Sequence, residues 1–359
     1  MSAALTTIFG TFGAATVWYG SKLLWNWIEK KIFKPKILIT FSKKGIAGNA
    51  KDRKKNKMLE PVMIFDEELQ KRLDGIVQAT KTINQKIKEK NRAVKYRNLL
   101  LYGPPGTGKT LFAQQLAERT GMSFAMASGA SFSKQGAMEA MDELFEWAKK
   151  SKGLILFIDE AESLLSERND LKPDSDAYRI FTNFLNHTGT RSDRFMIVLA
   201  TNRLGVIDQA MQRRIDDLVE LPLPGQKQRR LVLHAYRDTI LGDKVHNSES
   251  FIASVHQILT DAKIEQIVQK TAGLSNGDLE GIINMIKTDA DCSVQGTVSD
   301  SIVDTCVNRV MDKYEKFQKN GSEMVNTQPG SFDLKKLVGF FVAGLLGAAV
   351  VLLFLQRRK

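Results

Sequence analysis

The residues best suited to chemistry form a glycine-rich loop at 103–110, which reads Gly-Pro-Pro-Gly-Thr-Gly-Lys-Thr. The loop follows an apolar run at 99–102 and precedes a helix-forming run that starts at Leu111. Glycines let backbone N–H groups turn toward anionic oxygens, and a helix N-terminus adds partial positive charge. Lys109 supplies a full charge, and the Thr110 hydroxyl can ligate Mg²⁺. The sequence therefore predicts a nucleotide phosphate site, with the candidate residues Gly103, Pro104, Pro105, Gly106, Thr107, Gly108, Lys109, Thr110 and Leu111.

Two carboxylates, Asp159 and Glu160, follow the apolar run 154–158. Acids at a strand end beside a phosphate loop can act on the nucleotide. We expect Asp159 to hold the Mg²⁺ shell and Glu160 to orient or deprotonate the attacking water. The alternative is that the pair merely starts a helix.

Three more polar residues are candidates for the same chemistry. Asn202 follows the apolar run 195–200 and either holds the lytic water or simply ends a strand. Arg213 and Arg214 are adjacent. Adjacent arginines usually form a solvated face, and they act as arginine fingers only if a neighbouring subunit's nucleotide lies opposite them.

Alternating apolar and helical segments must position these residues. Helical spacing alternates with apolar runs at 98–102, 123–127, 154–158, 195–200 and 218–221. Continuous apolar strands of this kind predict a parallel sheet covered on both faces. From 226 to about 319 helical spacing dominates, which predicts a separate small helical domain.

Composition narrows the classes of protein. The 359 residues carry a net charge of +12, which favours an anionic neighbour such as lipid headgroups or nucleic acid. Cys292 and Cys306 have neither metal-ligand spacing nor a disulfide framework, so we expect a reducing compartment. The four histidines form no H-E-x-x-H motif, which excludes that class of zinc protease.

An apolar segment lies near each end of the chain. The first 21 residues carry no charged side chain, and 337–355 is an uncharged apolar run. About 20 such residues can span a bilayer, so both ends are predicted to be transmembrane. A signal peptide or a surface helix is the alternative for the first segment, and a buried core helix for the second.

Eleven lysines and arginines lie between 30 and 57. Positive charge beside a membrane helix marks its cytoplasmic or matrix side and can bind anionic lipid. A solvated linker or a nucleic-acid patch are the alternatives.

Five motifs together resemble the AAA branch of the AAA+ ATPases: GPPGTGKT at 103–110, LFIDEAE at 156–162, LATN at 199–202, IDQAMQRRID at 207–216 and GLSNGDL at 273–279. The resemblance implies an α/β fold, namely a three-layer P-loop AAA+ domain with a parallel sheet, followed by a small all-α lid domain. The apolar segments near the ends of the chain add terminal transmembrane helices to the expected fold. The expected domains are a membrane segment 1–28, a basic linker 29–59, an ATPase domain 60–225, a lid 226–319, a linker 320–336 and a transmembrane helix 337–355.

The same resemblance implies roles for the candidate residues. ATP and Mg²⁺ are the implied cofactors, with Thr110 and Asp159 as metal ligands. The candidate catalytic residues are Glu160, Asn202, Arg213, Arg214 and Lys109. The resemblance implies that Glu160 serves the attacking water and that Asn202 is the γ-phosphate sensor. Arg213 and Arg214 act on a neighbouring subunit's site in a ring, usually a homo-hexamer.

Segments 96–126, 144–165 and 195–202 are similar to those of a membrane-anchored mitochondrial AAA-domain group linked to nucleoids, cristae and lipid handling. This resemblance implies an integral membrane protein with its ATPase domain on the cytoplasmic or matrix side, which remodels a membrane-associated protein complex. The alternative function is an ATP-gated scaffold that tethers nucleic acid or anionic lipid through the basic linker.

The chain departs from these patterns in places. The long N-terminal coiled coil of that group is absent from this sequence, and the loop 131–136 lacks the aromatic-aliphatic-glycine trio of threading AAA proteins. Phe132 in that loop either reaches a central pore or packs in the core. Asn276 stands where glycine is usual.

Overall fold

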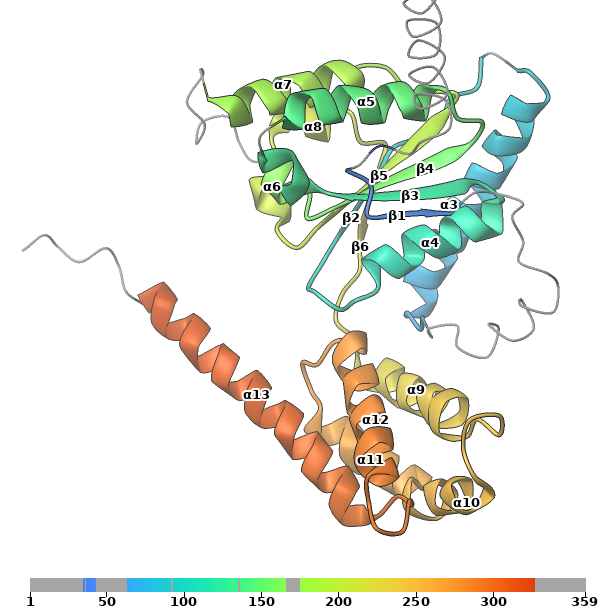
Figure 1. Ribbon diagram of the computed structural model, residues 1–359, viewed down its shortest axis with the longest axis vertical. Coiled ribbons are helices and arrows are strands. Elements are labelled where there is room, and N and C mark those ends of the chain that lie inside the picture. Colours follow the sequence, from blue (N-terminus) through green and yellow to red (C-terminus); the bar gives the residue numbers. More distant parts are fainter. Residues whose placement is uncertain are drawn as a thin grey trace, which may run out of the picture. The chain divides into compact units, whose positions relative to one another are not determined.

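The computed structural model describes residues 35, 37–42, 63–91, 93–134, 136–165 and 175–326. These residues include a six-stranded sheet with the strand order β1-β3-β4-β5-β2-β6 (Figure 1). Its strands are β1 (Thr40–Ser42), β2 (Leu99–Tyr102), β3 (Ser123–Ser128), β4 (Leu154–Asp159), β5 (Phe195–Thr201) and β6 (Asp217–Glu220). All neighbouring strands are parallel except β1, which pairs antiparallel with β3 at the edge.

Successive side chains of a strand point to opposite faces of the sheet. Both faces of this sheet carry apolar side chains, and helices cover both. Leu99 and Leu101 of β2 pack with α3 (Glu67–Lys88) and α4 (Lys109–Thr120). Leu100 faces the other way, into a cluster formed with α5 (Ala137–Lys149) and α7 (Asp176–His187). Figure 1 shows these two helix pairs on opposite sides of the sheet.

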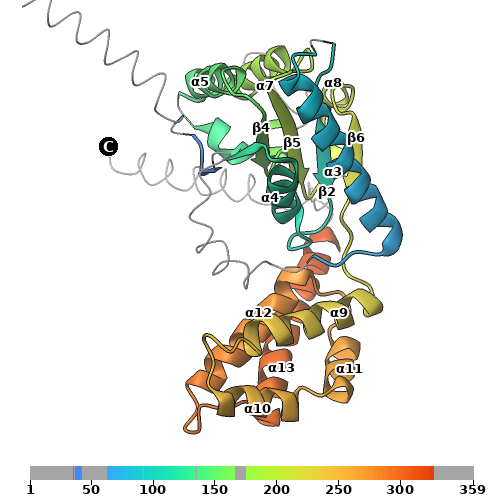
Figure 2. The ribbon, with the colours of Figure 1, turned by 90° about the vertical axis from the view of Figure 1, so that its right-hand side faces the viewer.

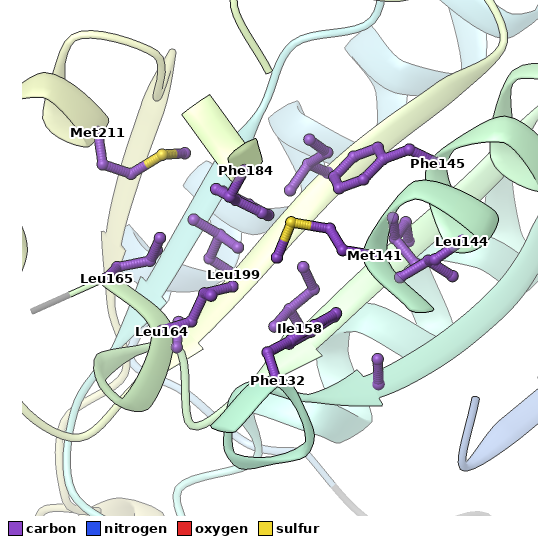
Figure 3. Close-up of a cluster of buried hydrophobic side chains, with 14 of the residues drawn as sticks. Phe132, Met141, Leu144, Phe145, Ile158, Leu164, Leu165, Phe184, Leu199 and Met211 are labelled. Atoms are coloured by element: carbon purple, nitrogen blue, oxygen red, sulfur yellow. The ribbon is translucent and has the colours of Figure 1, made fainter. Parts of the chain in front are cut away.

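The core between the sheet, α5 and α7 also contains short elements (Figure 3). These are the 3₁₀ helix η2 (Gly129–Ser133), α6 (Glu162–Leu165) and α8 (Gln209–Gln212). Phe132 of η2 is 1% exposed and lies beside Ile158 and Met141 in this cluster. Phe132 therefore packs in the core and does not reach a central pore.

A group of helices follows the sheet in sequence (Figure 2). It consists of α9 (Gln226–Tyr236), the π-helix η5 (Arg237–Leu241), α10 (Glu249–Ile258), α11 (Asp261–Lys270), α12 (Asn276–Asp291) and α13 (Asp300–Asn326). The described residues after Gln226 contain no strand, as the sequence predicts. The chain divides into two compact units within α13, after Cys306, and the sheet and the helices α3 to α12 lie in the first.

The five strands predicted from apolar runs are confirmed within one or two residues. The edge strand β1 was not predicted. The helix α3 ends at Lys88, because Lys90 takes a left-handed backbone conformation (φ 63°) and Asn91 N–H donates to Lys86 O at 3.1 Å.

The predicted fold class needs one correction, because it included terminal transmembrane helices. In the part of the chain that the structure describes, no helix combines the length and the apolar character needed to cross a bilayer. The predicted segments 1–28 and 337–355 lie outside the described residues, as does most of the basic linker 29–59. The described fold is therefore α/β, with a mainly parallel sheet and a following group of helices.

Candidate nucleotide-binding site

The loop 103–110 joins β2 to α4, and three of its glycines have positive φ: 143° at Gly103, 76° at Gly106 and 100° at Gly108. L-amino acids rarely adopt such angles. A Cβ at Gly103 would lie 2.2 Å from Leu221 O, and a Cβ at Gly106 would lie 2.3 Å from Ser275 Oγ. Steric crowding as well as backbone conformation therefore requires glycine at these two positions.

Lys109 is the first residue of α4 and is 7% exposed. Its Nζ donates to Gly103 O, to Pro104 O and to Asn202 Oδ1, each at 2.8 Å. Burial lowers the pKa of Lys109, and the negative charges of Asp159 and Glu162 oppose that shift. The structure thus holds a buried ammonium group at the positive end of a helix, an arrangement that an anion stabilises.

Thr110 and Asp159 bring a hydroxyl and a carboxylate together beside this lysine. Asp159 is the last residue of β4, and its Oδ2 accepts a hydrogen bond of 3.2 Å from Thr110 Oγ1. Its Oδ1 accepts from the N–H of Glu160 at 2.9 Å. Oxygen donors of these two kinds suit Mg²⁺, which is bound in proteins by few carboxylates together with phosphate oxygens and water.

Glu160 adopts a left-handed backbone conformation (φ 51°), which is uncommon for a residue with a side chain. Ser128 Oγ donates to its Oε2 at 3.1 Å. Gly129, which follows Ser128, cannot be replaced without a clash, because a Cβ there would lie 2.4 Å from Glu160 O. The chain therefore places the Glu160 carboxylate through a strained turn and a specific hydrogen bond.

A cavity of about 520 Å³ lies against these groups. Ligand pockets for molecules of nucleotide size fall in the range of roughly 300 to 1,000 Å³. The predicted site residues that line this cavity are Pro105, Gly106, Gly108, Lys109, Thr110, Leu111, Asp159, Glu160 and Asn202. The structure thus gathers the loop, the carboxylates and the amide around one space.

The same cavity has six lining residues that were not predicted to belong to the site: Met63, Gln114, Tyr236, Asn276, Gly277 and Glu280. Asn276 and Gly277 belong to the GLSNGDL motif, so the sequence did contain a signal for them. Gly277 N–H donates to Gly106 O at 3.0 Å and joins α12 to the phosphate loop. Burial, followed by the nearby Glu280 carboxylate, raises the pKa of Tyr236.

Other predicted residues lie away from the cavity surface. Gly103, Pro104 and Thr107 shape the loop, and Thr107 Oγ1 donates to Pro104 O at 2.9 Å. Arg213 and Arg214 do not line the cavity. Arg214 Nη1 donates to Ala210 O at 2.7 Å, whereas Arg213 is exposed and its side chain has no partner within the residues described.

Comparison with known proteins agrees with this geometry. Residues 99–223 match the family model described as "ATPase family associated with various cellular activities (AAA)". The chain is 32% identical over 274 residues to human "ATPase family AAA domain-containing protein 3A", which covers 76% of this chain and 45% of that protein. The protein 3 of Xenopus tropicalis is 30% identical over 328 residues, with 87% and 54% covered. That of Caenorhabditis elegans is 35% identical over 224 residues, with 61% and 38% covered.

The chain thus matches between 38% and 54% of the length of these relatives. The AAA match contains the phosphate loop, both carboxylates, Asn202 and the arginine pair. Residues 99–223 therefore belong to the AAA family of ATPases, and the relatives of the chain are ATPase family AAA domain-containing proteins 3.

Proposed function

We propose that the chain binds ATP with Mg²⁺ in the cavity beside Lys109 and hydrolyses it. One observation carries the proposal. A buried ammonium group, a hydroxyl–carboxylate pair, a second carboxylate and an amide meet around a single cavity at the N-terminus of α4. Phosphoryl transfer requires this combination, since positioning and charge compensation determine most of its barrier.

Each group has a separate task in this proposal. The loop N–H groups and Lys109 hold the phosphates, and Thr110 and Asp159 hold Mg²⁺, which neutralises charge on the phosphate oxygens when it is bound. Glu160 accepts a proton from the attacking water. Asn202 already accepts a hydrogen bond from Lys109 and lies where its amide can orient that water or the terminal phosphate.

The proposal extends to a ring of subunits. Arg213 is exposed and lies outside the cavity of its own chain, which leaves its guanidinium group available to a neighbour. A fixed cation that meets a nucleotide across a subunit interface stabilises the charge of the transition state. We propose such a ring, with six identical subunits as the expected number.

Substitution of the two proposed catalytic groups tests this function. Glu160→Gln should retain ATP binding and lose at least 100-fold in hydrolysis rate, because the amide cannot accept the proton. Lys109→Ala should lose both ATP binding and ATP hydrolysis. Glu139→Gln removes an exposed carboxylate on α5, away from the cavity, and is the matched control. Unchanged hydrolysis in Glu160→Gln would overturn the assignment of the base.

We further propose that ATP turnover remodels a protein complex in mitochondria, where the group that this chain resembles is found. Glu160→Gln should hold the substrate complex in the ATP state, whereas Lys109→Ala should not. Crosslinking of both variants in their own cells, followed by fractionation and identification of the held proteins, tests this part. A partner recovered equally with both variants would contradict it.

A further inference from the structure

Asn276 is the first residue of α12 and lines the same cavity as the phosphate loop. Its side chain is 8% exposed, and its Oδ1 is buried without a hydrogen-bond partner within the described part of the chain. Buried acceptors are almost always paired, so an unpaired one on a residue that lines a cavity indicates a missing donor.

The neighbouring residues of α12 cannot supply that donor, because they are already engaged. Ser275 and Asp278 form a capping box, in which Ser275 Oγ accepts from Asp278 N–H and Asp278 Oδ2 accepts from Ser275 N–H. Gly277 N–H donates to Gly106 O at 3.0 Å. The contact between α12 and the loop therefore leaves the acceptor of Asn276 for whatever occupies the cavity.

The chemistry of the acceptor selects a part of the nucleotide. An amide oxygen needs a donor, and the ionised phosphate oxygens are acceptors only. The donors on ATP are the ribose hydroxyls and the amino group of the base. Asn276 is adjacent to Gly277, which touches the phosphate loop, and the ribose is the donor-bearing part joined directly to the phosphates.

We infer that Asn276 Oδ1 accepts a hydrogen bond from a ribose hydroxyl of the bound nucleotide. This inference rests on the proposed ATP site and adds a residue that determines specificity for the sugar. It also gives α12 a direct contact with the nucleotide, in addition to its contact with Gly106. Residue 276 thus distinguishes ribonucleotides from deoxynucleotides.

Calorimetric titration of the full chain with ADP, 2′-deoxy-ADP, 3′-deoxy-ADP and inosine diphosphate tests the inference without turnover. The wild type should bind ADP about five- to tenfold more tightly than at least one deoxy analogue, as expected for loss of one hydrogen bond. Asn276→Ala should weaken ADP by a similar factor and bind that analogue as the wild type does. Asn284→Ala, an exposed change on the same helix, should match the wild type.

The outcomes separate this inference from the proposed function. Failure of the wild type to bind any diphosphate would overturn both. Equal wild-type affinity for ADP and both deoxy analogues would overturn the ribose contact alone, and this comparison needs no variant to fold. Equal weakening of all four ligands in Asn276→Ala would also overturn it. Discrimination lost only between ADP and inosine diphosphate would assign the contact to the base instead.

Discussion

Ser128 and Glu160 meet at the carboxyl ends of two neighbouring parallel strands, where the Ser128 hydroxyl donates to Glu160 Oε2 at 3.1 Å. Ser128 pairs in register with Asp159, the residue before Glu160. The same hydroxyl oxygen accepts from Ala130 N–H at 3.2 Å, so Ser128 also caps η2. The hydrogen bond fixes one oxygen of the proposed base and leaves Oε1 for a water molecule.

Ser128→Ala should therefore lower kcat about tenfold, because a displaced base is a poorer proton acceptor, and should leave KM within about twofold. Ser128→Thr keeps a hydroxyl group and should restore most of the rate. Steady-state ATPase assays of both variants measure this. A kcat in Ser128→Ala equal to that of the wild type would show that the bond does not position Glu160.

Gly106→Ala should reduce nucleotide affinity more than tenfold. The new Cβ would lie 2.3 Å from Ser275 Oγ, so the capped end of α12 must shift away from the loop. Gly296 is the matched control, because its φ is also positive (61°) and a Cβ there would meet nothing within 4 Å. Both substitutions should cost about 1–2 kcal/mol of stability through backbone strain, measured by urea unfolding. Equal ADP affinity in the two variants, measured by calorimetry, would contradict the steric argument.

Much of this site follows from local sequence, and the remainder depends on tertiary packing. The apolar runs predict the strands because a sheet buried on both faces needs continuous apolar residues. The same pattern does not predict β1, because Thr40–Ser42 is short, antiparallel and half-exposed. The residues Lys109, Asp159 and Asn202 stand at strand or helix ends, so topology alone brings them together.

Met63, Tyr236 and Glu280 show the opposite case. They come from a loop and two helices that are far apart in sequence, and only packing places them on one cavity. No local pattern distinguishes them from ordinary core or surface residues. The sequence marks Asn276 as unusual in its motif, but only the buried, unpaired Oδ1 in the structure indicates what the side chain does.

Tyr96→Phe should make stability less sensitive to alkaline pH. The Tyr96 hydroxyl donates to Asn84 Oδ1 at 2.7 Å, and Asn84 Nδ2 donates to Thr120 O at 3.0 Å, which links α3 to α4. Burial, with a smaller effect of Asp193, raises the pKa of Tyr96 to about 12. Because the unfolded tyrosine ionises near pH 10, the contribution of Tyr96 is complete below that pH and is lost between pH 10 and 12.

Over that interval the free energy of unfolding of the wild type should fall by about 2 kcal/mol more than that of Tyr96→Phe. Urea unfolding of both proteins at pH 9 and pH 11.5 measures the difference. At pH 7 the variant should be about 1–3 kcal/mol less stable, because Asn84 Oδ1 loses its donor. Parallel pH dependence of the two proteins would contradict the burial argument.

Arg213→Ala should abolish ATP hydrolysis in the assembled protein without changing ATP affinity, because Arg213 is exposed and lies outside its own cavity. If each site combines Glu160 of one subunit with Arg213 of the next, co-expression of Arg213→Ala with Glu160→Gln should restore activity. In a head-to-tail ring of randomly mixed equal parts, about a quarter of neighbouring pairs carry both intact groups, so about a quarter of the wild-type rate should return. Replacing the Glu160→Gln partner by the double variant removes every intact Arg213, and the rate should then stay at zero. ATPase assays of the purified mixed rings measure both cases, and a single Arg213→Ala variant as active as the wild type would rule out a shared site.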